Sequence, residues 1–398
     1  MKKLLVLGLA ILIAIPVFVN SANPTVDFEW YPATPLSLEV VHFNDTSQNQ
    51  SQIIERVWYF GDGYGATAKN PTHIYEKPGN YTVKLVVLWN ISGVIYGSSK
   101  EKTITVQNRP PIANAGPDQI LNVRNATFNA SASYDPDGNI TSYNWNFGDG
   151  TTGSGIVVTH TYASDGNFTV VLNVTDNNGS YATDTCNITI DTSAPITNCE
   201  LNGTSGENGW YISDVNVTFV VNETTSGLNK TFYRIDGGNW TVYNGTFNIS
   251  SEGIHLLEFY STDIAGNTEE IKNVTIKIDK TYPSISIITP EERKFYVFGR
   301  KVIPTLRKTI IVGKITVEVN SSDNIGISMV KFYVDGEEKY NDTSEPYEWR
   351  WGGAIGRKNL TVAAHDYAGL ISHDSIEVTM FSLFKPWSEN ALKDTKLS

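Results

Sequence analysis

The feature that most constrains this chain is a six-residue phrase that occurs twice, WYFGDG at residues 58–63 and WNFGDG at residues 145–150. The match continues without a gap for about thirty residues. The aligned pairs are Trp58/Trp145, His73/His160, Tyr75/Tyr162, Gly79/Gly166, Tyr81/Phe168, Val83/Val170, Leu85/Leu172 and Val87/Val174. A gapless register of this length indicates two duplicated domains rather than a turn that recurs by chance.

Both copies read as β structure. The segments YTVKLVV (81–87) and FTVVLNV (168–174) alternate with a period of two, which is typical of strands. In the second phrase, Gly148 and Gly150 permit the positive φ of a tight hairpin tip. We expect Asp149 to accept backbone N–H bonds within that turn.

The combination of WxFGDG, then T-H-x-Y, then G-x-Y/F-T-V resembles the PKD domain. The resemblance covers residues 23–107 and 108–191, with Pro110 and Pro111 at the junction. It implies two small β-sandwiches of the immunoglobulin-like type. It also implies a non-catalytic role as a spacer or adhesive module.

The second half contains a different duplicated phrase. FYRIDGGNWTVY (232–243) precedes FYSTDIAGN (259–267), as FYVDGEEKY (332–340) precedes VAAHDYAGL (362–370). These segments resemble two bacterial Ig-like domains at 192–281 and 282–381. The earlier one is similar to the module family named after a leptospiral outer-membrane protein. The predicted fold is thus all-β, a linear array of four immunoglobulin-like β-sandwich domains, with a tail at 382–398.

The N-terminus predicts export. Two lysines, a long apolar run and then Ser21 and Ala22 indicate a secretory signal peptide, expected to be a helix, over residues 1–22. A retained membrane anchor is the alternative, since the apolar run approaches spanning length. The mature chain is expected to be secreted or held at the cell surface.

The overall charge excludes one class of partner. A net charge of −12 and a pI near 5.0 argue against nucleic-acid binding, which requires a basic surface. One basic segment, EERKFYVFGRKVIPTLRK (291–308), is expected to be a solvated loop, with a docking patch for an acidic partner as the alternative.

Two cysteines are too few for a disulfide scaffold. Cys186 and Cys199 each alternate with apolar residues, so each thiol is expected in its own core. A disulfide between them across the domain junction is the alternative in an oxidising compartment.

The carboxylates are the strongest candidates for ligand binding. Asp135 and Asp137 alternate before a glycine in SASYDPDGNI, and could offer oxygens to a hard cation. Some PKD domains that resemble this one bind calcium at the corresponding loop, as a structural ion. The alternative is a solvated turn in which the carboxylates cap backbone amides. The first copy offers only Asp45 in this region, and Asp263 and Asp366 are expected to cap their D-x-A-G turns.

No residue set predicts catalysis. His73 and His160 recur with the fold, so we expect them to form structural hydrogen bonds, and no nucleophile or metalloprotease motif accompanies them. Tyr347 and Trp349 share a strand face with Trp351. An exposed row of such rings could stack on sugars, but the same alternation suits a sandwich core.

Acceptor sequences for N-glycosylation are unusually frequent. Asn-x-Ser/Thr occurs 22 times, and strands disfavour asparagine, so the alternation of strands does not account for the excess. The candidate sites that lie in predicted strands are Asn80, Asn173, Asn187, Asn216 and Asn273.

The sequence therefore predicts a non-enzymatic, glycosylated surface protein, a stalk, adhesin or envelope component that contacts a cell-envelope protein or glycan. The alternative is a substrate-binding accessory protein of a secreted polysaccharide- or protein-degrading hydrolase. Attachment to a membrane is expected only through an uncleaved signal segment.

Overall fold

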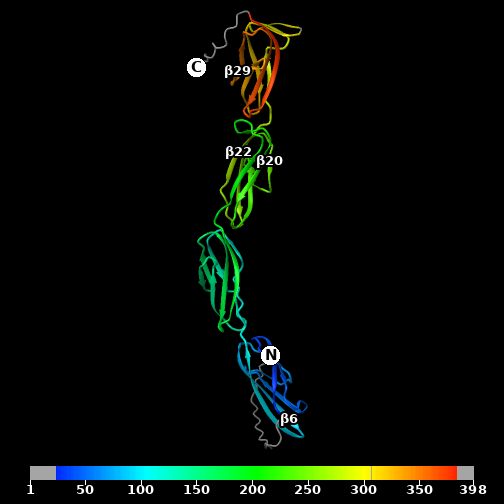
Figure 1. The fold of residues 1–398 in the computed structure, drawn as a ribbon, viewed down its shortest axis with the longest axis vertical. Helices are drawn as coiled ribbons and strands as arrows, with labels where there is room; N and C mark the ends of the chain where they lie inside the picture. Colours follow the sequence, from blue (N-terminus) through cyan, green and yellow to red (C-terminus); the bar gives the residue numbers. More distant parts are fainter. Residues whose placement is uncertain (1–23, 306, 383–398) are drawn as a thin grey trace. The chain divides into compact units, whose positions relative to one another are not determined.

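A computed structural model describes residues 24–305 and 307–382. Within these ranges the chain is built from β-strands and one short 3-10 helix, η1 (Gln50–Gln52), and contains no α-helix (Figure 1). The predicted all-β class is confirmed. The predicted signal peptide at 1–22 and all of the tail except Ser382 lie outside the described residues. No helix of the described part is long and apolar enough to cross a membrane.

The first domain has two antiparallel sheets. The three-stranded sheet has the order β1-β2-β5, with β1 Phe28–Tyr31, β2 Val40–Asp45 and β5 Thr72–Ile74. The four-stranded sheet has the order β4-β3-β6-β7, with β4 Gly65–Ala66, β3 Ile53–Tyr59, β6 Gly79–Ile91 and β7 Val94–Val106.

The second domain repeats this plan. One sheet pairs β12 (Val157–Thr161) with β9 (Asn125–Asn129). The other has the order β11-β10-β13-β14-β8, with β11 Thr152–Ser154, β10 Ile140–Asn146, β13 Gly166–Asp176, β14 Tyr181–Ile190 and β8 Gln119–Leu121.

The strand register confirms that the two domains are copies. Trp58 lies opposite Leu85 in the first domain, and Trp145 lies opposite Leu172 in the second. All four side chains are buried. The repeated phrase therefore places the same residues against the same partners in each core.

The third domain also has two sheets. The first has the order β15-β17-β20, with β15 Ile196–Asn202, β17 Val215–Asn222 and β20 Phe247–Ile249. The second has the order β16-β22-β21-β18-β19, with β16 Trp210–Tyr211, β22 Lys272–Ile278, β21 Gly253–Asp263, β18 Leu228–Ile235 and β19 Thr241–Val242.

The fourth domain has the largest sheet. Its smaller sheet has the order β23-β27-β30, with β23 Ser284–Thr289, β27 Ile315–Ser322 and β30 Tyr347–Trp351. The larger has the order β25-β24-β26-β32-β31-β28-β29, with β25 Arg300–Pro304, β24 Lys294–Val297, β26 Thr309–Val312, β32 Ile371–Phe381, β31 Gly356–Asp366, β28 Ile327–Val334 and β29 Glu337–Asp342.

Half of the basic segment that the sequence predicted to be a loop is β structure. Strands β24 and β25 form an antiparallel hairpin, and β24 also pairs in parallel with β26. The prediction was wrong because β25 is exposed along its whole length and so lacks the apolar alternation by which strands are recognised.

Each of the four domains has its own hydrophobic core. The chain divides into two compact units, residues 1–192 and 193–398, and each unit contains two of these cores.

Candidate functional site: a carboxylate cluster in the second domain

The two aspartates proposed as cation ligands lie in the loop between β9 and β10. Asp137 is 8% exposed, and its Oδ2 accepts hydrogen bonds from the backbone N–H of Arg109 at 2.9 Å and from the hydroxyl of Ser37. Asp135 is half-buried, and its Oδ1 accepts a bond from the N–H of Asp137 at 3.3 Å. The loop therefore encloses its carboxylates rather than leaving them in solvent.

Two further residues join this cluster that the sequence did not single out. Asp176, the last residue of β13, accepts N–H bonds from Asn178 and Ser180 through Oδ1. Its Oδ2 accepts a bond from the side-chain amide of Asn108 at 2.7 Å. A signal for Asp176 did exist: it ends an alternating strand and opens a glycine-containing turn, as Asp263 and Asp366 do.

Three oxygens of this cluster are enclosed and have no hydrogen-bond partner: Asn108 Oδ1, Asp135 Oδ2 and Asp137 Oδ1. Enclosed polar atoms nearly always have a partner, so three such oxygens in one cluster need an explanation. Burial raises the pKa of Asp135, and the neighbouring charges of Asp137 and Asp176 raise it further.

Carboxylate and amide oxygens are the ligands that calcium prefers. The residues present therefore fit the calcium ion for which the sequence offered Asp135 and Asp137 as candidate ligands, and Asn108 becomes a candidate third ligand. A bound ion would neutralise the clustered charge and hold the loop. Calcium binding at this loop stays a prediction.

In the first domain, the buried carboxylate of this region forms an ion pair with an arginine side chain. Asp45, at the matching end of β2, is buried and accepts a bond from Arg56 Nε at 2.6 Å through Oδ2. Its Oδ1 accepts the N–H of Ser47 at 2.9 Å, so both carboxylate oxygens have donors. Asp45 is therefore satisfied without an added ion.

The repeated histidines have the structural role predicted for them. His73 stacks on Phe60 with ring centroids 4.2 Å apart, and His160 stacks on Phe147 at 4.1 Å. Each donates to or accepts from the FGDG aspartate, with His160 Nε2 2.7 Å from Asp149 Oδ2. Asp149 also accepts the N–H of Thr151 at 3.0 Å, as expected for the turn.

The aromatic row of the fourth domain is part of its core. Tyr347 is 6% exposed and Trp351 is 4% exposed, while Trp349 is partly buried and stacks on Trp351 at 5.7 Å. These rings cannot form an exposed platform for sugars. The core alternative is confirmed for this row.

The glycosylation candidates point outward with one exception. Every asparagine of the 22 acceptor sequences is exposed except Asn173, which is half-buried and has an enclosed Oδ1. Several of the outward residues pair across strands with threonines, such as Asn80 with Thr105 at 2.8 Å. Asn187, Asn216 and Asn273 share this outward placement.

The two cysteines are free thiols, each within its own domain. Cys186 is buried in the core of the second domain, and burial raises the pKa of its thiol. Cys199 packs against the core of the third domain, and burial raises the pKa of its thiol to about 11. Each sulfur therefore packs in or against the hydrophobic core of its own domain, as expected, and a disulfide between the two stays a prediction.

Comparison with protein families agrees with these folds. Residues 21–106 and 108–190 match the PKD domain family, and residues 283–364 match a bacterial Ig domain family. The chain therefore contains tandem PKD domains followed by a bacterial Ig-like domain.

Similar stretches occur in bacterial proteases. The pre-pro-metalloprotease PrtV of Vibrio cholerae is 30% identical over 151 residues, which cover 38% of this chain and 16% of PrtV. Collagenase ColA of Clostridium perfringens is 30% identical over 148 residues, which cover 36% of this chain and 12% of ColA. The solved PKD1 domain of Vibrio cholerae PrtV is 33% identical, with 21% of this chain covering 100% of that domain at a TM-score of 0.20. The chain spans only a small part of these curated relatives' length.

Proposed function

We propose that this chain is a non-catalytic, exported protein of the cell surface, a glycosylated multi-domain stalk, adhesin or envelope component. Its partner would be a cell-envelope protein or glycan. Export is supported by the lysine-led apolar segment and the small residues at its end. The PKD and Ig-like domains supply folded length and faces for binding, but no catalytic motif accompanies them.

The observation that carries this proposal is the outward placement of the acceptor asparagines. Glycosylation requires an accessible side chain, and these asparagines are exposed on strands and loops in all four domains. Bulky glycans on several faces would keep a surface protein soluble and would block broad flat contacts. Such glycans favour a spacer protein that contacts its partner only through the surfaces that carry no glycan.

A second candidate is a substrate-binding accessory protein of a hydrolase. Its support is the similarity of the PKD region to parts of PrtV and ColA, which are named as a metalloprotease and a collagenase. The aromatic row that would have favoured polysaccharide binding is buried, so a protein substrate is the better form of this candidate.

Co-sedimentation distinguishes the two. Purified residues 23–398 would be mixed with envelopes from the source cells, with collagen fibrils and with insoluble polysaccharides. We expect the protein to pellet with the envelopes alone. Pelleting with collagen or one polysaccharide, but not with envelopes, would contradict the surface proposal and support the accessory role.

A further inference from the structure

A second carboxylate cluster lies in the other compact unit, where the third domain meets the fourth. Asp279 directly follows β22, the last strand of the third domain. Asp323 directly follows β27 and Asp366 is the last residue of β31, both in the fourth domain. Carboxylate oxygens of the three residues lie within 4.8 Å of one another.

Each carboxylate uses one oxygen for its own turn. Asp279 Oδ1 accepts the N–H of Thr281 at 3.1 Å, and Asp323 Oδ2 accepts that of Ile325 at 2.8 Å. Asp366 Oδ1 accepts the N–H of Leu370 at 3.0 Å, which confirms its predicted role as a turn cap.

The second oxygen of each carboxylate has no partner. Asp279 Oδ2, Asp323 Oδ1 and Asp366 Oδ2 are all enclosed without a hydrogen bond. Asp279 and Asp366 are themselves 0% exposed. An unpaired buried carboxylate is costly, and three that share one site also repel one another. Turn capping explains one oxygen of each residue but leaves the other three unexplained.

The pKa values of the three carboxyl groups reflect their burial and their closeness to one another. Burial raises the pKa of all three carboxyl groups. The charge of Asp323 further raises the pKa of Asp279, that of Asp366 raises the pKa of Asp323, and that of Asp279 raises the pKa of Asp366. Hydrogen bonds from the turn amides, and for Asp279 also from the Asn324 side chain, lower these pKa values but offset the increase only in part.

A bound cation would offset the free-energy cost of burying these unpaired carboxylate oxygens. The donors are carboxylate oxygens with no nitrogen or sulfur, which selects a hard cation and not zinc. Calcium binds oxygens at about 2.3–2.6 Å, so two oxygens on one calcium ion can lie up to about 5 Å apart. The observed spacing fits that limit.

We propose that Asp279, Asp323 and Asp366 bind a calcium ion that fixes the junction between the third and fourth domains. The site joins a linker residue to two loops of the following domain, so the bound ion would tie the domains together. This inference does not depend on the proposed function.

Hydrogen bonds near the cluster already connect the third domain to the fourth. The N–H of Glu207 donates to the carbonyl of Ala368 at 2.7 Å, and the side-chain amide of Asn208 donates to the carbonyl of Tyr367 at 3.0 Å. These bonds place a third-domain loop on the turn that begins at Asp366. An ion at this turn would act on an interface with defined geometry rather than on a mobile loop.

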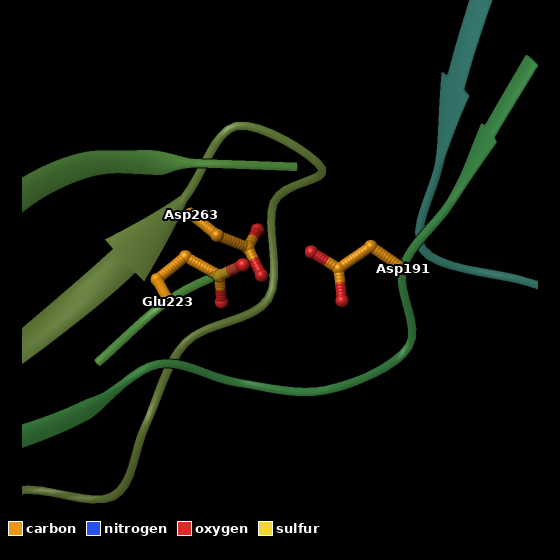
Figure 2. Close-up of side chains that lie close together, drawn as sticks. All are labelled: Asp191, Glu223 and Asp263. Atoms are coloured by element: carbon orange, nitrogen blue, oxygen red, sulfur yellow. The ribbon is translucent and has the colours of Figure 1, made fainter. Parts of the chain in front are cut away.

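The corresponding positions of the third domain lack the same unpaired oxygens. Figure 2 shows Glu223 and Asp263 with their carboxylates close together; Asp191, also labelled there, precedes the third domain in sequence as Asp279 precedes the fourth. Asp263 Oδ1 accepts N–H bonds from Gly266 and Asn267, and its Oδ2 accepts the Asn267 side-chain amide at 2.8 Å. The Asp279 cluster is therefore the stronger site.

The test uses the whole mature chain and the variant Asp323→Asn. Asparagine keeps an oxygen to cap Ile325 but removes one charge from the cluster. The matched control is Asp342→Asn, which changes a buried carboxylate of the same domain whose two oxygens accept the N–H groups of Ser344 and Glu348. Calcium binding would be counted by isothermal titration calorimetry, and thermal unfolding would be followed by scanning calorimetry with calcium or with a chelator.

We expect Asp323→Asn to bind one calcium ion fewer than the unmodified chain, while Asp342→Asn binds the same number. In chelator, Asp323→Asn should unfold at a higher temperature than the unmodified chain, because repulsion is relieved; in calcium the order should reverse. A calcium count unchanged by Asp323→Asn would overturn the proposal, whatever the count at Asp135 and Asp137. So would a loss of stability that is equal with and without calcium, since that result indicates turn caps alone.

Discussion

Replacing Gly148 by alanine is expected to unfold most of the second domain while the other domains stay folded. Gly148 has φ of +81°, where an L side chain is strained by about 1–2 kcal/mol. A Cβ added there would also lie 2.6 Å from the backbone carbonyl oxygen of Thr169 on β13, closer than atoms can approach. Backbone cannot rotate away as a side chain can, so we expect a total loss of roughly 4 kcal/mol or more.

The neighbouring Gly150 supplies the matched control. It has φ of +88°, but a Cβ there would meet nothing within 4 Å. Gly150→Ala should therefore cost only the conformational term, about 1–2 kcal/mol. Hydrogen-exchange mass spectrometry of the full chain would compare the two variants on peptides from β10 and β13. Equal loss of protection in both would show that the close approach to Thr169 is unimportant and would contradict this explanation of the motif.

Trp145→Ala is expected to be nearly as damaging. Trp145 is 1% exposed, packs against Phe128, and donates from Nε1 to the carbonyl of Gly155 at 3.0 Å. Removing a buried tryptophan costs about 3–5 kcal/mol, and the carbonyl left without its donor adds to that loss. Domains of this size have small total stability, so the second domain should lose most of its protection from exchange.

The duplication makes this prediction sharper. Trp58 in the first domain is buried and donates to the carbonyl of Ala68 at 3.0 Å, so Trp58→Ala should cause a similar loss confined to the first domain. Trp240→Ala, at a partly exposed ring that lies 4.6 Å from the Arg234 guanidinium, should cost only about 1 kcal/mol. If the Trp58 and Trp145 variants lost protection in different amounts or across both domains, the two copies would not be energetically equivalent and independent.

Much of the fold could be predicted because the repeated motif indicates both the local turn and the pairing of strands that are distant in sequence. Each WxFGDG phrase combines three local signals. They are a tryptophan that is buried, a glycine whose turn leaves no room for a side chain, and an aspartate that caps the same turn. The strand pairing of Trp58 with Leu85 and of Trp145 with Leu172 follows from that one register. The β24–β25 hairpin could not be predicted in this way, because its outer strand is stabilised by backbone pairing and buries no side chain of its own.

Only some residues of the candidate sites could be predicted from the sequence, because the others come together only in the folded chain. Asp135 and Asp137 are neighbours in sequence, so their shared loop could be recognised. Asn108 and Asp176 stand 68 residues apart, and only the folded chain brings them together. Similarly, Asp366 was predicted as a turn cap, but only the folded chain brings its unpaired second oxygen close to the carboxylates of Asp279 and Asp323.

The most direct test of the proposed surface role is protease treatment of intact source cells, followed by mass spectrometry of the peptides released. The proposal predicts peptides from all four domains, with hexose-bearing asparagine at several exposed sites such as Asn80, Asn187, Asn216 and Asn273. Asn173, which is half-buried, serves as the internal comparison and should be modified less. A chain that is cleaved only after the cells are lysed, and that carries no glycan, would contradict the account.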